Sequence, residues 1–342
     1  MTYRMYLESD LNRVFTQSLG PIAAAELGAV LSHQLDARDT SIELVDEGRA
    51  SYLAFTFDGD REALARRVAK LSATAALFQE HSASSLEPIP LVDDLTFSTE
   101  VVTGQRYKGK TSERLTRLML NLATAVADVA DEDGWSLLDP MCGRGTTLNW
   151  ALLYGGRSTG LDVDRRALDD YATFLAQWAK KCRLPHKMQR YKKQNSESRH
   201  FDFTVARDRA TLAAKSKPDI RTLHAPADDA SVPVGTHSML VSDLPYGIQH
   251  QARSATTDAP TSMSDLVGNV LGRCAPALRS GGSLALSWNV RSLGRPDMVD
   301  QLVDAGCECV DIGGFEHRVD RTIQRDVIVA RRITDDRTAP QR

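Results

Sequence analysis

The segment Ser238–Gly247, SMLVSDLPYG, combines side chains that could activate a poorly nucleophilic nitrogen. The lone pair of an exocyclic base amine is delocalised into the ring, so the amine needs acceptors for its hydrogens before it attacks an electrophile. The Asp243 carboxylate can be one acceptor and the Leu244 carbonyl the other, while Pro245 stiffens the turn. Tyr246 offers a flat face on which the base can stack. The segment predicts methyl transfer to a base amine; the alternative is a surface turn rich in Asp, Pro and Gly.

A glycine loop lies about a hundred residues earlier, in LLDPMCGRGTT, residues 137–147. A strand is predicted to end at Asp139 and a helix to begin near Thr146, with Gly143 and Gly145 between them. Glycines let the backbone approach a ligand closely, and the N–H groups of a helix start favour an anionic group, a phosphate or a carboxylate. Neither the dinucleotide pattern GxGxxG nor the phosphate-binding GK[ST] is complete. The loop indicates a nucleotide-type site of another kind, with a plain tight turn as the alternative.

An acidic residue follows this loop at the spacing of a ribose ligand. Asp162 ends STGLD, 23 residues after Asp139. An acid at the end of the second strand, about 20 residues beyond the loop, can accept hydrogen bonds from both ribose hydroxyls. Since Asp is also favoured at helix starts, the alternative is an N-cap.

These motifs occur in the order of a known enzyme family. DPMCGRGT, GLD and DLPYG together resemble the Rossmann-like amino-methyltransferases with a D/N-P-P-Y-type motif. Within them, the chain looks like the THUMP-associated, UPF0020-type tRNA guanine-N2 methyltransferases. YKGKTSERLTRLMLNLA, from Tyr107 to Ala123, and the late HRVDRTIQRDVIVAR add to this likeness, which covers roughly Gln105 to Arg332. Leu244 stands where many relatives have a first proline.

The resemblance implies S-adenosylmethionine as the cofactor and guanine N2 of tRNA as the acceptor. It places the cofactor site at Asp139, Pro140, Cys142, Gly143, Gly145, Thr146, Asp162 and an acid after the third strand, either Asp228 or Asp229. Either of these last two could accept a hydrogen bond from the adenine amine, and both could instead cap the following turn.

Two other functions fit part of the pattern. A DNA adenine-N6 or cytosine-N4 methyltransferase would use the same catalytic logic, but we find no dedicated domain for reading base sequence. A non-catalytic RNA-binding protein that kept the fold would have no need of Asp243 and Tyr246.

The residues before the resemblance predict a small α+β domain over 1–95, similar to a THUMP or ferredoxin-like core that could dock RNA. A strand near Tyr3–Leu7, a helix from Pro21, strands in SIELV and ASYLAFTF and a second helix over 61–78 would form a βαββα layer. Residues 80–95 have the Ser and Pro content of a connector. Residues 1–60 are acidic, with a net charge of -6.

The second predicted domain, over 105–334, is an α/β methyltransferase fold. A helix with Leu115, Leu118, Met119, Leu122, Val126 and Val129 on one face comes first. From Trp135 onward, short apolar strands alternate with helices, which predicts a Rossmann-like, doubly wound, mostly parallel sheet. The last two strands lie close in sequence, so we expect an antiparallel hairpin at the sheet edge. Residues 335–342 are expected to be a disordered tail.

A basic segment separates the second and third strands of this domain. Residues 180–221 hold 13 Lys/Arg against four Asp/Glu, a net charge of +9. Such a segment would attract the phosphates of RNA, expected to be tRNA. The alternative is a solvated, partly disordered loop that balances an otherwise acidic protein.

Composition sets the remaining expectations. There is no run of about 18 apolar residues and no signal-peptide core, so no membrane contact is expected. The five cysteines are scattered and odd in number, which indicates structural thiols and a reducing, cytoplasmic setting. Neither His250 nor His317 has a partner at metal-ligand spacing. The oligomeric state does not follow from the sequence.

Overall fold

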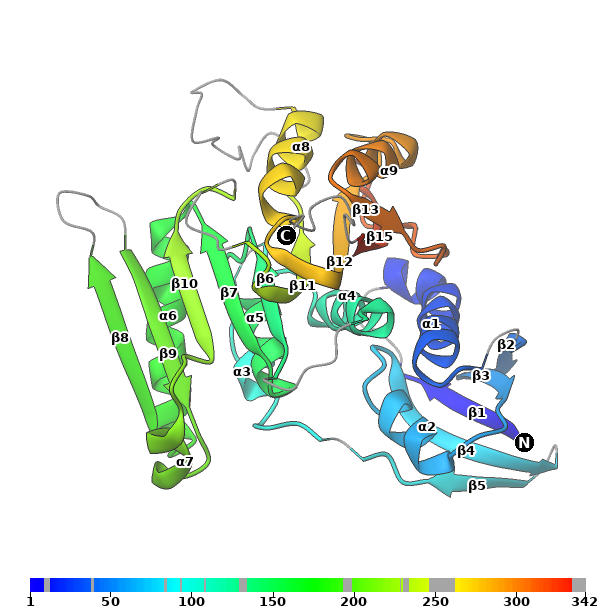
Figure 1. Cartoon of the computed structure of the whole chain (residues 1–342). Coiled ribbons are helices and arrows are strands. Elements are labelled where there is room, and N and C mark those ends of the chain that lie inside the picture. The colour runs from blue at the N-terminus through cyan, green and yellow to red at the C-terminus, as the bar shows by residue number, and fades with distance from the viewer. Residues whose placement is uncertain are drawn as a thin grey trace, which may run out of the picture.

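The chain forms two sheets, one from residues 2–89 and one from residues 136–332 (Figure 1). The computed structural model describes residues 1–8, 13–37, 40–82, 85–92, 94–107, 109–128, 134–192, 199–227, 229, 234–245 and 262–333. Val129, Asp228, Tyr246, His250 and the predicted tail over 335–342 therefore lie outside the described residues. Among the described helices, none combines the length and apolar character needed to cross a membrane.

The N-terminal sheet is antiparallel with the strand order β2-β3-β1-β4-β5. Its strands are β1 (Thr2–Leu7), β2 (Ile42–Glu47), β3 (Ala50–Thr56), β4 (Thr74–Ser82) and β5 (Ser85–Ile89). Helices α1 (Arg13–Gln34) and α2 (Arg61–Val68) supply the crossovers. The order β2-β3-β1-β4 is that of a ferredoxin-like split βαβ layer, to which β5 adds an edge.

The predicted helix over 61–78 is wrong in its second half. Helix α2 ends at Val68, and Thr74–Ser82 is strand β4. Leu77 is buried and pairs with Met5 in the middle of β1, so a ladder and an apolar contact outweigh the helix propensity of the Ala-rich TAAL. The predicted connector over 80–95 is wrong as well, because it holds the end of β4 and all of β5.

The C-terminal sheet has the order β13-β15-β12-β11-β6-β7-β10-β9-β8, with β14 paired to β15. Its strands are β6 (Ser136–Asp139), β7 (Arg157–Asp162), β8 (His186–Lys192), β9 (Arg199–Val205), β10 (Ile220–His224), β11 (His237–Asp243), β12 (Leu278–Asn289), β13 (Cys307–Cys309), β14 (His317–Arg318) and β15 (Gln324–Arg332). The five strands from β12 to β10 are parallel, and β15 runs antiparallel between β12 and β13. The predicted Rossmann-like sheet with an antiparallel edge hairpin is confirmed.

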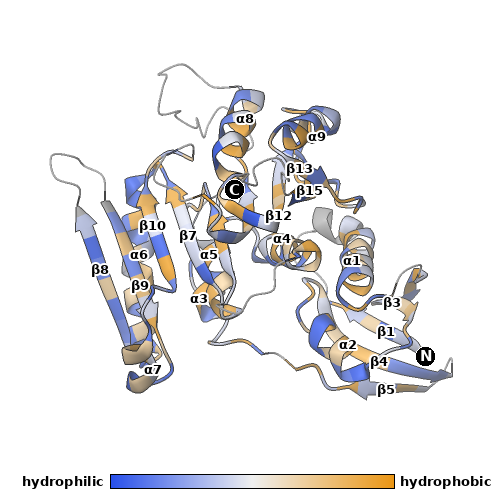
Figure 2. Cartoon of the chain, in the orientation of Figure 1, coloured by the Kyte–Doolittle hydropathy of each residue, from blue (hydrophilic) through white to orange (hydrophobic). Residues whose placement is uncertain are grey.

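Helices cover both faces of this sheet. Helices α4 (Glu113–Val126), α5 (Thr146–Leu153) and α6 (Arg165–Lys181) pack on one face, and α8 (Met263–Cys274) and α9 (Arg295–Asp304) pack on the other. The short helix α3 (Glu100–Thr103) packs beside α5 and α6, with Val101 and Val102 in the same core, and the short helix α7 (Arg209–Ala214) follows β9. Successive strand residues alternate between the two cores: Leu137, Val241 and Ala285 face the first, and Leu138, Leu240 and Leu284 face the second. In Figure 2 the outermost strand, β8, is largely hydrophilic.

A fully buried carboxylate joins the two sheets. Glu26 of α1 accepts hydrogen bonds from the Ser72 backbone N–H at 3.0 Å, from Ser72 Oγ at 2.5 Å and from Asn121 Nδ2 of α4 at 2.7 Å. Burial raises the pKa of Glu26, while the nearby Arg117 and these hydrogen bonds lower it. One side chain thus connects α1, α4 and the turn after α2, and it acts together with the hydrogen bonds from Arg114 to Glu8 and from Arg117 to the Ala69 carbonyl.

Replacing Glu26 should therefore change both stability and its pH dependence. Glu26→Ala leaves buried donors without an acceptor, at a cost of about 2–4 kcal/mol in the free energy of unfolding. Because the pKa of Glu26 is higher in the folded than in the unfolded protein, the free energy of unfolding of the wild type falls as the pH rises from the ordinary carboxyl pKa to the folded-state pKa. Glu26→Gln has no titrating group at this position and should not show this fall. Urea unfolding across the pH range measures both effects. Glu62→Gln, at an exposed carboxylate of α2, is the control and should move neither; an unchanged pH slope in Glu26→Gln would contradict the assignment.

Candidate functional site

The glycine loop has the predicted conformation. Strand β6 ends at Asp139, and α5 begins at Thr146 with Gly145 as its N-cap. Gly143 and Gly145 both have positive φ, 52° and 77°. A Cβ on Gly145 would lie 2.1 Å from the Tyr171 ring, whereas a Cβ on Gly143 would meet nothing within 4 Å. The backbone at Gly143 is thus open to a ligand, and the backbone at Gly145 is held against α6.

This difference predicts unequal effects of two alanine substitutions. Gly143→Ala should cost about 1 kcal/mol, the left-handed backbone penalty alone. Gly145→Ala adds a clash with a fully buried ring and should cost roughly 2–4 kcal/mol. Chemical unfolding of both variants measures the difference, and equal costs would show that Tyr171 does not hold the loop.

Asp139 connects the glycine loop to the strand that bears Asp243. Its Oδ1 atom accepts hydrogen bonds from the Met141 N–H at 3.1 Å and from Ser242 Oγ at 2.8 Å. Asp139 is only 2% exposed, and burial raises its pKa to about 7. Since Ser242 immediately precedes Asp243, the first and third motifs of the sequence are hydrogen-bonded neighbours.

Asp162 also binds the glycine loop. Its Oδ2 accepts the Gly143 N–H at 2.7 Å and its Oδ1 accepts the Asp164 N–H at 2.7 Å. The alternative that Asp162 caps α6 is wrong, because Asp164 is the N-cap and accepts from Arg166 and Ala167. Burial raises the pKa of Asp162. Each carboxylate oxygen keeps a further lone pair, so ribose hydroxyls could still donate to it.

Asp243 lies at the carboxyl end of β11, where strand order reverses between β6 and β11 and where open α/β sheets bind ligands. Its Oδ2 accepts a hydrogen bond from Thr111 Oγ1 at 2.9 Å, and it pairs in register with Ser287 of β12. Burial raises the pKa of Asp243, whereas the Arg325 charge, Thr111 and Ser287 lower it. The carboxylate is thus surrounded by polar partners.

The structure gives a reason for leucine at position 244. The Leu244 N–H donates to the Ser287 carbonyl at 2.9 Å, which continues the pairing of β11 with β12. The side chain is 1% exposed and packs in the core beneath α8. A proline would lose this hydrogen bond. Pro245 is half-buried, and Tyr246 lies outside the described residues.

Two residues beside Asp243 did not emerge from the sequence. Thr111 is 132 positions away in the chain and directly precedes Ser112, the N-cap of α4. The adjacent Lys110 donates to the carbonyls of Val102 and Gln105 and pairs with Glu113, which holds the segment in place. In the sequence, Thr111 belongs to the segment YKGKTS, which resembles a motif of the family. This resemblance did not indicate a role for Thr111.

The second such residue is Arg325, on β15. It pairs in register with Asn289 of β12 and with His317 of β14. Alternation along β15 puts Arg325 on the same face as Val327 and Val329, the face that α4 covers. Asp243 is on this face too, because Val241, two residues earlier in β11, belongs to the same core. Burial lowers the pKa of Arg325, and Asp243 raises it. His317 is buried, and its Nδ1 lies 2.8 Å from the Phe315 carbonyl, which indicates a structural role.

Removing the Arg325 charge should raise the pKa of Asp243. In Arg325→Met the desolvation of Asp243 is no longer offset by a nearby cation, whereas Arg325→Lys should restore much of the wild-type value. Carbon-detected NMR titration of the side-chain carboxyls, with Asp243→Asn to assign the signal, measures it. A titration midpoint that stays in place in Arg325→Met would exclude this coupling.

The acid expected after the third strand is only partly described. The Asp229 N–H donates to the Pro226 carbonyl at 3.1 Å, and its own carbonyl accepts from Arg273 Nε at 3.1 Å. Asp228 is outside the described residues, so its assignment to the adenine stays a prediction. Within the described part of the chain, no three His, Cys, Asp or Glu side chains cluster as metal ligands.

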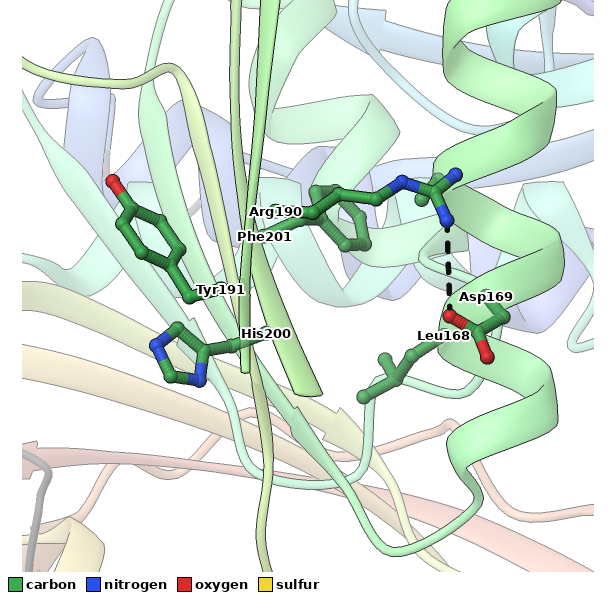
Figure 3. Close-up of a pocket in the computed structure, with 7 residues that line it drawn as sticks. Leu168, Asp169, Arg190, Tyr191, His200 and Phe201 are labelled. Carbon is green, nitrogen blue, oxygen red and sulfur yellow. Dashed lines mark ion pairs between the residues drawn. The ribbon is translucent and has the colours of Figure 1, made fainter. Parts of the chain in front are cut away.

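The basic segment is largely regular structure. Strands β8 and β9 form a hairpin that pairs antiparallel with β10, so the alternative of an irregular loop is wrong for the described residues. Part of the charge is neutralised by ion pairs, Arg221 with Asp202 at 2.8 Å and Lys215 with Asp219 at 2.5 Å. Arg190 lies 3.9 Å from Asp169 of α6 beside a pocket of about 180 Å³ (Figure 3).

Comparison with known proteins shows similarity at the level of fold. No family model matches the chain, and no curated protein matches its sequence. TrmN from Thermus thermophilus is 16% identical, with a TM-score of 0.39, over 86% of this chain and 60% of that one. A TehB-like SAM-dependent methyltransferase from Corynebacterium glutamicum is 12% identical, with a TM-score of 0.35, over 59% of this chain and 81% of that one. A putative S-adenosylmethionine-dependent methyltransferase from Listeria monocytogenes is 13% identical, with a TM-score of 0.36, over 60% of this chain and 94% of that one.

Proposed function

We propose that this chain is an S-adenosylmethionine-dependent methyltransferase that methylates an exocyclic base amine of RNA, specifically guanine N2 in tRNA. The observation that carries the proposal is the position of Asp243. This carboxylate ends β11 at the switch point of the sheet, and Ser242 beside it donates directly to Asp139 of the glycine loop. A group suited to activating an amine therefore lies next to a nucleotide-type site.

The loop residues fit this cofactor. The open backbone at Gly143 would accommodate the cofactor's amino-acid end, and the remaining lone pairs of Asp162 would accept its ribose hydroxyls. Pro140, Cys142 and Thr146 belong to the same loop and helix start, and Asp228 or Asp229 would accept from the adenine amine. When bound, the cofactor supplies an electrophilic methyl group on a sulfonium.

The residues of the catalytic turn would make the amine reactive. Asp243 and the Leu244 carbonyl would each accept one amine hydrogen, which localises the lone pair on nitrogen. Asp243 would take the proton that the nitrogen loses on methylation. Burial raises the pKa of Asp243 and so strengthens it as a base, and the Arg325 charge opposes this rise. Pro245 would fix the turn, and Tyr246 would stack on the base.

The distribution of charge along the chain supports binding of a nucleic acid by the C-terminal domain. Residues 1–95 contain eight Lys/Arg and 15 Asp/Glu, a net charge of -7, whereas residues 180–221 have +9. Phosphates would therefore bind the basic segment in preference to the N-terminal domain. The choice of RNA, and of guanine N2, rests on the resemblance of the motifs.

Substrate and mechanism can be tested together. The protein is incubated with labelled cofactor and separate pools of unmodified tRNA, rRNA and DNA, and the product nucleoside is identified by mass. We expect N2-methylguanosine in tRNA. N6-methyladenine or N4-methylcytosine in DNA would replace the proposal with its DNA rival, and cofactor binding without transfer to any pool would indicate a non-catalytic binder.

Asp243→Ala should lower turnover at least 100-fold, because it removes an acceptor for the amine hydrogens. Cofactor affinity, measured by calorimetry, should stay nearly unchanged. Asp304→Ala, at an exposed position at the end of α9, is the control and should alter neither quantity. An equal loss of turnover and cofactor affinity in Asp243→Ala would contradict the role given to Asp243.

A further inference from the structure

The strands β8, β9 and β10 present one covered face and one open face. Phe201, Phe203 and Ile220 are buried on the face that α6 covers. The residues between them point to the other side, where Lys187, Gln189 and Arg221 are exposed and Tyr191, His200, Asp202, Thr204 and Leu223 are half-buried. We call this second set the open face.

A pair of stacked rings lies on the open face. Tyr191 and His200 are cross-strand partners, with ring centroids 5.0 Å apart and ring planes 20° from parallel. Figure 3 shows both rings pointing away from α6, whereas Arg190 and Phe201 point toward it. The Tyr191 hydroxyl donates to Asp202 at 3.3 Å, and Arg221 holds the same carboxylate with two hydrogen bonds of 2.8 and 2.9 Å. The rings therefore have a fixed position.

Register places this ring pair at the same edge of the sheet as the proposed active site. His200 lies opposite Leu223, and the next residue, His224, lies opposite Asp162 of β7. Four strand steps separate β9 from β11, which ends at Asp243. At about 4.8 Å a step, β9 and β11 are roughly 19 Å apart along the sheet. The rings point away from α6 and the Asp243 side chain is on the α4 side, so a bound segment of a few nucleotides would pass over the strand ends to reach Asp243.

Charge defines the kind of partner that fits the open face. The three strands carry five Lys/Arg and one Asp. On the open face Lys187 and Arg221 are exposed, and the one carboxylate there, Asp202, is paired with Arg221. The acidic N-terminal sheet lies at the opposite end of the molecule from β8 (Figure 1). A polyanion would therefore approach from the β8 side, and flat rings among cations suit unpaired bases.

We propose that the open face binds a single-stranded segment of the substrate RNA, with one base stacked on the Tyr191–His200 pair and Lys187 beside the phosphates. The identity of the bound RNA as substrate rests on the proposed function; the binding itself does not. Sheets with exposed rings bind single-stranded RNA in this way, because every base has a face that can stack whatever its sequence.

The test measures binding of the full chain to fluorescent oligouridylate and to unmodified tRNA by anisotropy, without cofactor. Tyr191→Ala should weaken binding roughly 5- to 100-fold, the range for loss of one stacked base. Tyr191→Phe keeps the ring and should retain affinity. Lys187→Gln should weaken binding and reduce its salt dependence. The control is Tyr52→Ala, which removes a ring of the Tyr6–Tyr52 pair on the acidic sheet and should have no effect.

The outcomes separate this inference from the proposed function. Wild-type affinity in Tyr191→Ala would overturn the inference even if the protein methylates tRNA. Equal losses in Tyr191→Ala and Tyr191→Phe, with thermal unfolding unchanged, would also overturn it, because the ring would not be the binding element. Tyr191-dependent binding in a protein that transfers no methyl group to RNA would uphold the inference and refute the proposed function.

Discussion

The hydrogen bond from Ser242 to the buried Asp139 carboxylate is the interaction on which the site depends. It joins β6 to β11 at the point where strand order reverses, so the glycine loop and the Asp243 turn lie side by side at the same edge of the sheet. Asp139 is also anchored to its own loop through the Met141 N–H. A change in either strand would therefore displace both halves of the proposed site together.

Three carboxylates with raised pKa values lie along this one edge, at Asp139, Asp162 and Asp243. Burial is the main cause for each of them, and each is bound by backbone or side-chain donors. A cationic ligand would be stabilised among such groups, which agrees with the sulfonium of the proposed cofactor. The positive charge of Arg325 lowers the pKa of Asp243 and so partly offsets the effect of burial.

The two sheets differ in charge. The N-terminal sheet is acidic and is joined to α4 through the buried Glu26 cluster, and α4 begins beside Thr111 and thus beside Asp243. The edge strand β8 of the C-terminal sheet is basic and lies far from the first sheet. The N-terminal sheet is therefore connected through α4 to the edge that bears Asp243, and the proposed contact with RNA lies at the opposite end of the molecule.

The sequence alone determined the motifs, the parallel sheet and the edge on which Asp139, Asp162 and Asp243 lie, because strand ends, glycine loops and apolar alternation are local patterns. Only the tertiary structure brought Thr111 and Arg325 to Asp243, since contacts across a hundred residues leave no periodic signal. Strand β4 and the hairpin of β8 and β9 could not be predicted from the sequence for the same reason. Their local composition favours a helix or a loop, and pairing with a neighbouring strand decides their conformation.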